Sequence, residues 1–131
     1  MPRALRVSVP ALVIAAAALL LPASVSSRTP SKDLGQERIA AAKATFEAVK
    51  AALAAGSGTP ESAYLWSVRW LAAQQEAGQP RAKALADHLS RVSQLETAVK
   101  ARFQSGAATR ADVLAAAYYR VEAEFWSAAK K

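Results

Sequence analysis

Residues 94–124 read QLETAVKARFQSGAATRADVLAAAYYRVEAE. They align without a gap with residues 44–74, ATFEAVKAALAAGSGTPESAYLWSVRWLAAQ, so the chain repeats itself at a spacing of 50 residues. In both copies an Ala-rich helical pattern runs into a Gly, a Thr follows three residues later, and a second helical pattern begins. Repeats of this length indicate one supersecondary unit used more than once, because each unit needs a neighbour to bury its apolar face. The repeat therefore predicts a helical hairpin that occurs twice.

The spacing of apolar residues predicts four helices. Apolar side chains recur at steps of three and four residues, which places them on one side of a helix. The predicted stripes are Ile39, Ala42, Phe46, Val49 and Leu53 in a helix at about 32–55; Tyr64, Val68 and Leu71 in a second helix that starts at Pro60; Leu85, Leu89, Val92, Leu95, Val99 and Phe103 in a third at about 80–105; and Leu114, Ala117, Tyr118, Val121 and Phe125 in a fourth. Residues 28–131 contain no alternating pattern typical of strands, so the predicted class is all-α.

Turn and cap residues separate these helices. The breaks fall at Gly56-Ser57-Gly58, Gly78-Gln79-Pro80 and Gly106; the predicted N-caps are Ser31, Thr59 and Thr109, the last forming a capping box with Asp112. Connections this short force neighbouring helices to run antiparallel. We therefore expect two consecutive antiparallel helical hairpins, at about 32–77 and 80–130. Together they would form one domain, 28–131, as a coiled-coil-like up-and-down four-helix bundle.

The first residues have the pattern of a secretory signal peptide. Arg3 and Arg6 supply positive charge, and an uncharged run at 11–21 is followed by small residues at 23–27. The run is too short to span a bilayer comfortably, so residues 1–27 are predicted to be removed on export. Retention as an uncleaved anchor is the alternative. A lipoprotein is excluded because the chain has no Cys. We expect a periplasmic or extracellular protein that has no stable transmembrane span after cleavage.

The charges favour a solvated surface over a binding site for polyanions. The formal net charge is +7, but Lys and Arg are scattered along the helices without a basic block. Contact with a membrane surface or an acidic partner remains the alternative, whereas no motif for nucleic-acid binding is present. Asp87 with Arg91, and Glu96 with Lys100, stand four residues apart and are predicted to pair on the outer side of the third helix.

Catalytic and metal-binding patterns are missing from the sequence. His88 is the single His, and we expect it to be solvated rather than part of a Ser/His/Asp site. Without Cys and with scattered carboxylates the chain offers no metal-ligand cluster, and Glu122 and Glu124 face different ways on a helix. The loop 56–59 lacks the Lys and the preceding strand of a phosphate-binding loop. The sequence predicts a protein that is not an enzyme, with no cofactor and no metal.

Four aromatic residues lie off the predicted stripes and are the candidate interaction surface. They are Trp66 and Trp70 in the second helix and Tyr119 and Trp126 in the fourth. They could form an open surface for a partner helix, a polysaccharide or a membrane interface. Alternatively they fill the seam between the two hairpins, since each helix of a four-helix bundle contacts two neighbours. The repeat favours a role for the tryptophans, because they stand where the second copy has Ala116 and Arg120.

The second copy of the repeat resembles a known helical family. The stretches 99–106 (VKARFQSG), 109–116 (TRADVLAA) and 120–124 (RVEAE) resemble the helical repeat of TolC-type outer-membrane efflux proteins. In that family an aromatic precedes a Gly, then Ser/Thr, Asp, Leu and Ala follow, and an Ala-Glu pair comes later. The resemblance covers about 30 residues, with a weaker copy at 44–74. It implies long helical hairpins and the export of small molecules through a trimeric tunnel.

Together these patterns predict an exported, non-enzymatic helical module that acts in the cell envelope through a protein partner or through self-association. Two alternatives stay open. One is an accessory or truncated relative of an efflux system, which the TolC-type resemblance implies. The other is a ligand-binding helical bundle lined by the four aromatic residues.

Overall fold

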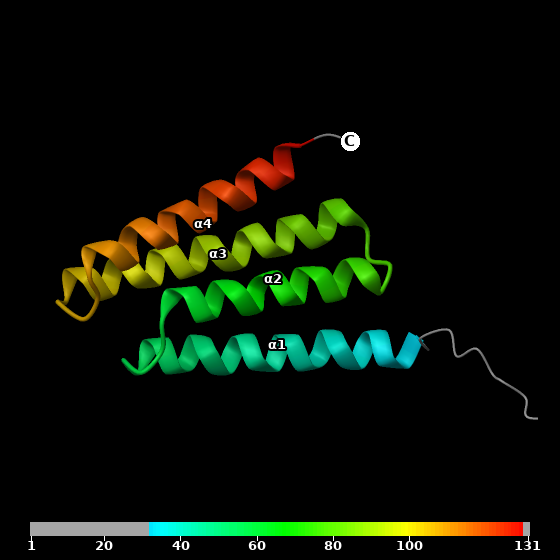
Figure 1. Ribbon diagram of the computed structural model, residues 1–131, viewed down its shortest axis with the longest axis horizontal. Helices are drawn as coiled ribbons and strands as arrows, with labels where there is room; N and C mark the ends of the chain where they lie inside the picture. Colours follow the sequence, from blue (N-terminus) through cyan, green and yellow to red (C-terminus); the bar gives the residue numbers. More distant parts are fainter. Residues whose placement is uncertain (1–31, 130–131) are drawn as a thin grey trace, which may run out of the picture.

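The protein is a four-helix up-and-down bundle, as the sequence predicts. The computed structural model describes residues 32–129, which form α1 (Lys32–Ala54), α2 (Pro60–Glu76), α3 (Arg81–Gln104) and α4 (Arg110–Ala128). Successive helices run antiparallel, and no strand occurs within these residues (Figure 1). The predicted signal peptide at 1–27 and the predicted N-cap Ser31 lie outside the described residues.

The turns after α1 and α3 have the same geometry. Gly56 and Gly106 adopt left-handed backbone conformations, with φ of 89° and 77°. Their N–H groups donate to Leu53 O at 3.1 Å and Phe103 O at 3.0 Å, which closes each helix. Residues other than Gly are strained at such φ values, so these two positions fix where each hairpin turns.

The helix starts after these turns are capped as predicted. The Thr59 hydroxyl accepts from Ser62 N at 3.2 Å, and Pro60 takes the first helical position. The Thr109 hydroxyl accepts from Asp112 N at 3.1 Å while Thr109 N donates to the Asp112 carboxylate at 2.8 Å, a complete capping box. The hydrogen bonds that Thr109 donates to the Asp112 carboxylate, from its backbone N–H and from its hydroxyl, lower the pKa of Asp112. The third helix starts one residue later than expected, because Pro80 is its N-cap.

The helices pack around α2, which contacts the other three. α1 packs mainly against α2, whereas α4 packs against α3 and α2, so α1 and α4 lie at opposite sides of the bundle (Figure 1). The main core cluster contains residues from all four helices: Phe46, Leu53, Ala63, Leu95, Val99 and Ala116. A smaller cluster of Leu71, Ala84 and Leu85 packs against Trp126.

The face of α4 that packs against the core is opposite to the predicted face. Four of the five residues of its predicted stripe are exposed, Leu114 by 59%, Tyr118 by 61%, Val121 by 52% and Phe125 by 71%, while the fifth, Ala117, is partly buried. Ala116 and Ala123 are fully buried instead. The two alanines let the α4 backbone approach α2 and α3 closely, which brings Tyr119 and Trp126 into contact with those helices. The prediction was wrong because α4 is apolar on both sides, and the face that packs best is the one with the smaller residues.

Candidate functional site

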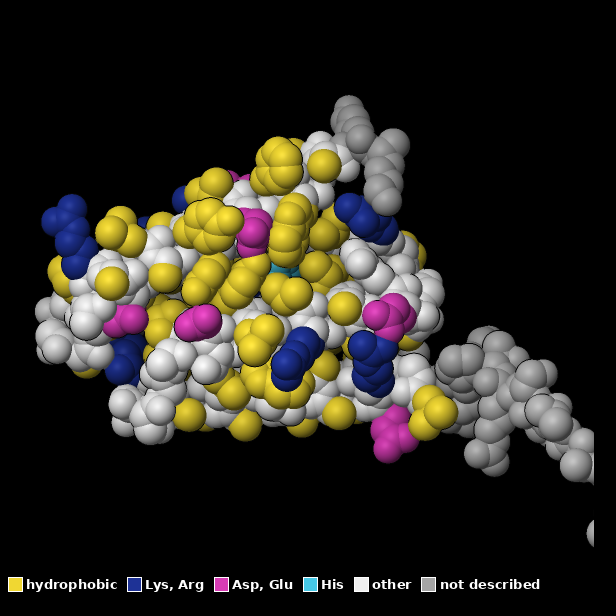
Figure 2. Space-filling view, in the orientation of Figure 1, with side chains coloured by type: hydrophobic (Ala, Val, Ile, Leu, Met, Phe, Trp, Pro, Cys, Tyr) yellow, Lys and Arg dark blue, Asp and Glu magenta, His cyan; other side chains and the backbone are white. Residues whose placement is uncertain are grey.

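The exposed apolar stripe of α4 is the candidate site. We call Leu114, Tyr118, Val121 and Phe125 the α4 outer face. They follow one another at steps of four, three and four residues, so they lie in one line along the helix, opposite the buried Ala116 and Ala123. Figure 2 shows hydrophobic side chains gathered over α4 and α2 on one face of the molecule. Leu65 of α2, which is 44% exposed, is a further exposed apolar residue.

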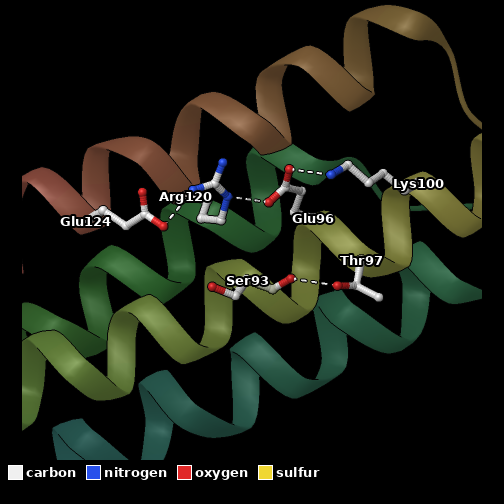
Figure 3. Close-up of polar contacts among 6 residues, drawn as sticks. All are labelled: Ser93, Glu96, Thr97, Lys100, Arg120 and Glu124. Carbon is white, nitrogen blue, oxygen red and sulfur yellow. Dashed lines mark hydrogen bonds and ion pairs between the residues drawn. The ribbon is translucent and has the colours of Figure 1, made fainter.

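Ion pairs anchor α4 on α3 along one side of this face. Arg120 Nε donates to the Glu96 carboxylate at 2.6 Å, and its Nη1 donates to Glu124 at 2.6 Å (Figure 3). Lys100 holds the other oxygen of Glu96 at 2.7 Å. The hydrogen bond from Lys100, together with that from Arg120, lowers the pKa of the largely buried Glu96 carboxyl. The sequence predicted the pairing of Glu96 with Lys100, whereas the bond from Arg120 comes from the tertiary fold.

A carboxylate on the other side of the face ties α4 to α2. Glu122 accepts from the hydroxyl of Tyr118 at 3.2 Å and also from the hydroxyl of Tyr64 on α2. The hydrogen bond to Glu122, with its negative charge, raises the pKa of Tyr118, and burial together with Glu122 raises the pKa of Tyr64. Tyr119, the next residue, stacks on Tyr64 with ring centroids 3.9 Å apart. The α4 outer face therefore lies on a helix that is fixed from both sides.

The four predicted surface aromatics are half-buried and do not gather on one open surface. The centroid of the Trp70 ring lies 5.8 Å from the centroid of the Phe46 ring. The guanidinium carbon of Arg91 lies 4.1 Å from the same Trp70 centroid. Trp66 is covered by the Arg69 guanidinium at 4.5 Å. Tyr119 packs against the main core cluster and Trp126 against the smaller one. Tyr119 and Trp126 thus pack where the two hairpins meet, whereas Trp70 packs on Phe46 within the first hairpin.

His88 is fully buried, contrary to the solvated position that the sequence analysis assigned to it. Its Nδ1 lies 2.8 Å from the Ser67 hydroxyl, and its ring stacks on Trp126 at 5.6 Å. Burial and the nearby positive charge of Arg91 lower the pKa of His88 to about 4, so the ring is neutral at neutral pH. The missed signal was its spacing: His88 falls three residues after Leu85 and four before Val92, on the apolar stripe of α3.

Arg91 is also buried, and it does not pair with Asp87 as predicted. Its Nε donates to the Ser67 hydroxyl at 2.9 Å and its Nη2 to the Ser67 carbonyl at 3.2 Å. Asp87 accepts instead from Lys83 at 2.9 Å and from Gln74 at 3.0 Å. The prediction failed because Ser67 and the Trp70 ring of α2 offer Arg91 partners inside the bundle that a single-helix argument cannot include.

The buried Ser67 and His88 pair has the atoms of a nucleophile and its base, but it has no access for a substrate. The Ser67 hydroxyl accepts from Arg91 Nε and lies 2.8 Å from His88 Nδ1. Both side chains have an exposed fraction of 0%, so no substrate can reach the hydroxyl. Ser67 of α2, together with His88 and Arg91 of α3, forms a buried polar contact that joins the two helices.

Residues 32–129 contain neither a metal-ligand cluster nor a helix that could span a membrane. No group of three or more His, Asp or Glu side chains there could hold a metal ion. None of the four helices is both long and apolar enough to cross a membrane. A groove of about 280 Å³ lies between α2, α3 and α4, lined by Val68, Leu71, Ala72, Gln75, Arg81, Leu85 and Trp126.

The chain matches no protein-family model, and it has no significant match among curated proteins or solved structures. The resemblance to TolC-type efflux proteins therefore rests only on the short stretches 99–106, 109–116 and 120–124.

Proposed function

We propose that this protein is an exported, non-enzymatic helical module of the cell envelope that docks a protein partner through the α4 outer face. The observation that carries the proposal is the exposure of four apolar side chains in one line, each more than half accessible to solvent. Single exposed apolar residues are ordinary on protein surfaces, but a contiguous apolar patch is characteristic of an interaction site.

The form of the patch favours a helical partner. Anchors at steps of four, three and four residues are the pattern by which one helix recognises another helix or a groove. Tyr118 and Phe125, the two aromatic anchors, are residue types that are enriched in the cores of interfaces, and Tyr is also frequent among the residues that dominate the free energy of binding. The contacts of Arg120 and Glu122 hold α4 in place, so docking requires little ordering of the backbone.

The non-enzymatic part of the proposal is consistent with the position of Ser67 and His88. Ser67 and His88, the one Ser-His pair in contact among the described residues, are sealed inside the core. Export rests on the charged and apolar pattern of residues 1–27. The TolC-type resemblance makes a helical hairpin of an efflux tunnel one partner of suitable chemistry.

Photo-crosslinking in living cells tests docking. A benzoylphenylalanine placed at Tyr118 or at Phe125 should give a specific protein adduct in the envelope fraction. The matched control is the same probe at Ala48, an exposed residue of α1 that faces away from the core. Equal labelling at all three positions, or no adduct at Tyr118 and Phe125, would contradict the proposal.

A second candidate, the ligand-binding bundle, is favoured by the groove beside Trp126. Its floor is apolar, and Arg81 and Gln75 add polar groups to its lining, as is usual for small-molecule sites. A ligand there would change the fluorescence of Trp126. A lipid and glycan library that shifts the emission of the wild type but not that of Trp126→Phe would support this candidate, and no shift anywhere would exclude it.

A further inference from the structure

The α4 outer face has opposite charges at its two ends. Arg110 begins α4 and has no ion-pair partner among the described residues. Glu124 lies two heptads later on the same side of the stripe, and only one of its carboxylate oxygens is bonded, to Arg120. A helix whose flanking charge changes sign along its length complements a copy of itself that runs in the opposite direction.

We propose that the partner of this face is the α4 outer face of a second copy, paired antiparallel about a two-fold axis near Ala117. This inference rests on the proposed docking role and names its occupant. A two-fold interface needs only one patch that is complementary to itself. With the axis at Ala117, Arg110 of each copy lies beside Glu124 of the other, whereas a parallel pair would place Glu124 against Glu124.

The side-chain sizes fit this register. Phe125, the most exposed anchor, falls opposite the small Thr109 of the other copy, and Leu114 falls between Tyr118 and Val121. The spacing of the face matches alternate a and d positions of a heptad, with Leu114 and Val121 at d and Tyr118 and Phe125 at a. Arg110, Ala117 and Glu124 then occupy g positions, the positions that set the orientation of paired helices.

The two aromatic anchors supply about a third of the area that a standard interface buries on each partner. Tyr118 and Phe125, at 61% and 71% exposed, offer roughly 250 Å² between them if an aromatic side chain buries about 150–250 Å². A standard interface buries about 800 Å² per partner. Leu114 and Val121, the alanines beside them and the stems of Arg110 and Glu124 provide further area along the same helix.

Single cysteines test both the pairing and its direction, because the full chain contains no Cys. Each variant of the full chain would be treated with a short bismaleimide, which joins two nearby thiols. Antiparallel pairing predicts a linked dimer from Ala117→Cys. It predicts little from Ala111→Cys, where the two thiols would lie roughly 18 Å apart along the axis at 1.5 Å per residue. Ala48→Cys on α1 is the control for random collision and for aggregation.

Three results would overturn the inference: no linked dimer from Ala117→Cys, equal linking at Ala48, or equal linking at Ala111, which indicates a parallel pair. Reversal of charge gives an independent check. Arg110→Glu should weaken dimerisation about tenfold in sedimentation, because it loses two ion pairs and adds two repulsions. The double variant Arg110→Glu with Glu124→Lys should restore it, and failure of that rescue would contradict the proposed register.

The photo-crosslinking described above separates this inference from the proposed function. An adduct at Tyr118 that contains two copies of this chain supports both. An adduct with a different protein, together with no linked dimer from Ala117→Cys, supports docking and overturns self-pairing.

Discussion

Tyr119 of α4 stacks face to face on Tyr64 of α2, with ring centroids 3.9 Å apart and planes 7° apart. Tyr118, the neighbouring residue on α4, is 61% exposed. This pair of adjacent tyrosines shows which side of α4 faces the core and which side is left open.

Replacement of Tyr119 should therefore destabilise the bundle, and replacement of Tyr118 should not. Tyr119→Ala removes a stacked ring from the seam and should reduce the free energy of unfolding by about 2–3 kcal/mol. Tyr118→Ala is the matched control and should change it by less than about 0.5 kcal/mol. Urea unfolding followed by circular dichroism measures both. Equal losses would show that α4 does not have the orientation described.

The position of His88 makes stability depend on pH. Burial lowers its folded pKa from 6.5 to about 4, so the unfolded chain binds an extra proton between these values. The stabilisation is fully present above pH 6.5, and it decreases as the pH falls towards 4, by roughly 3 kcal/mol in total at 1.36 kcal/mol per unit. Unfolding free energies across this range should show the loss in the wild type and a flatter profile in His88→Gln. A profile of the same slope in both would place His88 in solvent.

Glu96 makes a second contribution to the pH dependence of stability, and it acts at lower pH than His88. Its folded pKa is lowered by Lys100 and Arg120, so its stabilisation is complete above the ordinary Glu pKa of about 4.3 and is lost as the pH falls below it. Glu96→Gln should cost about 2 kcal/mol at pH 7, less than a fully buried pair because Arg120 is partly solvated. Glu47→Gln, which affects only the exposed pair with Lys50, should cost less than about 0.5 kcal/mol. Similar losses in the two variants would mean that the contact between α3 and α4 contributes little.

Export makes a prediction about the N-terminus. If residues 1–27 act as a signal peptide, the protein recovered from the envelope should begin near Arg28, after cleavage at Ser26 or Ser27. Intact-mass spectrometry of the recovered chain measures this directly. A mass that includes residues 1–27 would show that the segment is retained as an anchor.

Local signals predicted the helices well, because each acts within a few residues. Gly56, Thr59, Gly106 and Thr109 fix turns and caps through hydrogen bonds to their immediate neighbours. These bonds do not depend on the rest of the fold. The element bounds therefore agree with the prediction to within about one residue at most ends.

The orientation of α4 could not be predicted in the same way. Both of its faces are apolar, and the spacing of Leu114, Tyr118, Val121 and Phe125 is the better heptad. What selects the other face is the fit of Ala116 and Ala123 against α2 and α3, with the stacking of Tyr119 on Tyr64. Such fits involve residues far apart in the sequence, so no single-helix pattern contains them. The candidate site is therefore the stripe that the sequence analysis had assigned to the core.

Docking through the α4 outer face is tested most directly by the photo-crosslinking probe at Phe125, the most exposed of its anchors at 71%. We predict a specific protein adduct from Phe125 that disappears when Tyr118 and Val121 are both replaced by Ser, while the free energy of unfolding changes by less than about 1 kcal/mol. An adduct that persists in that double variant, or the absence of any adduct in the envelope of cells that export the protein, would contradict the account.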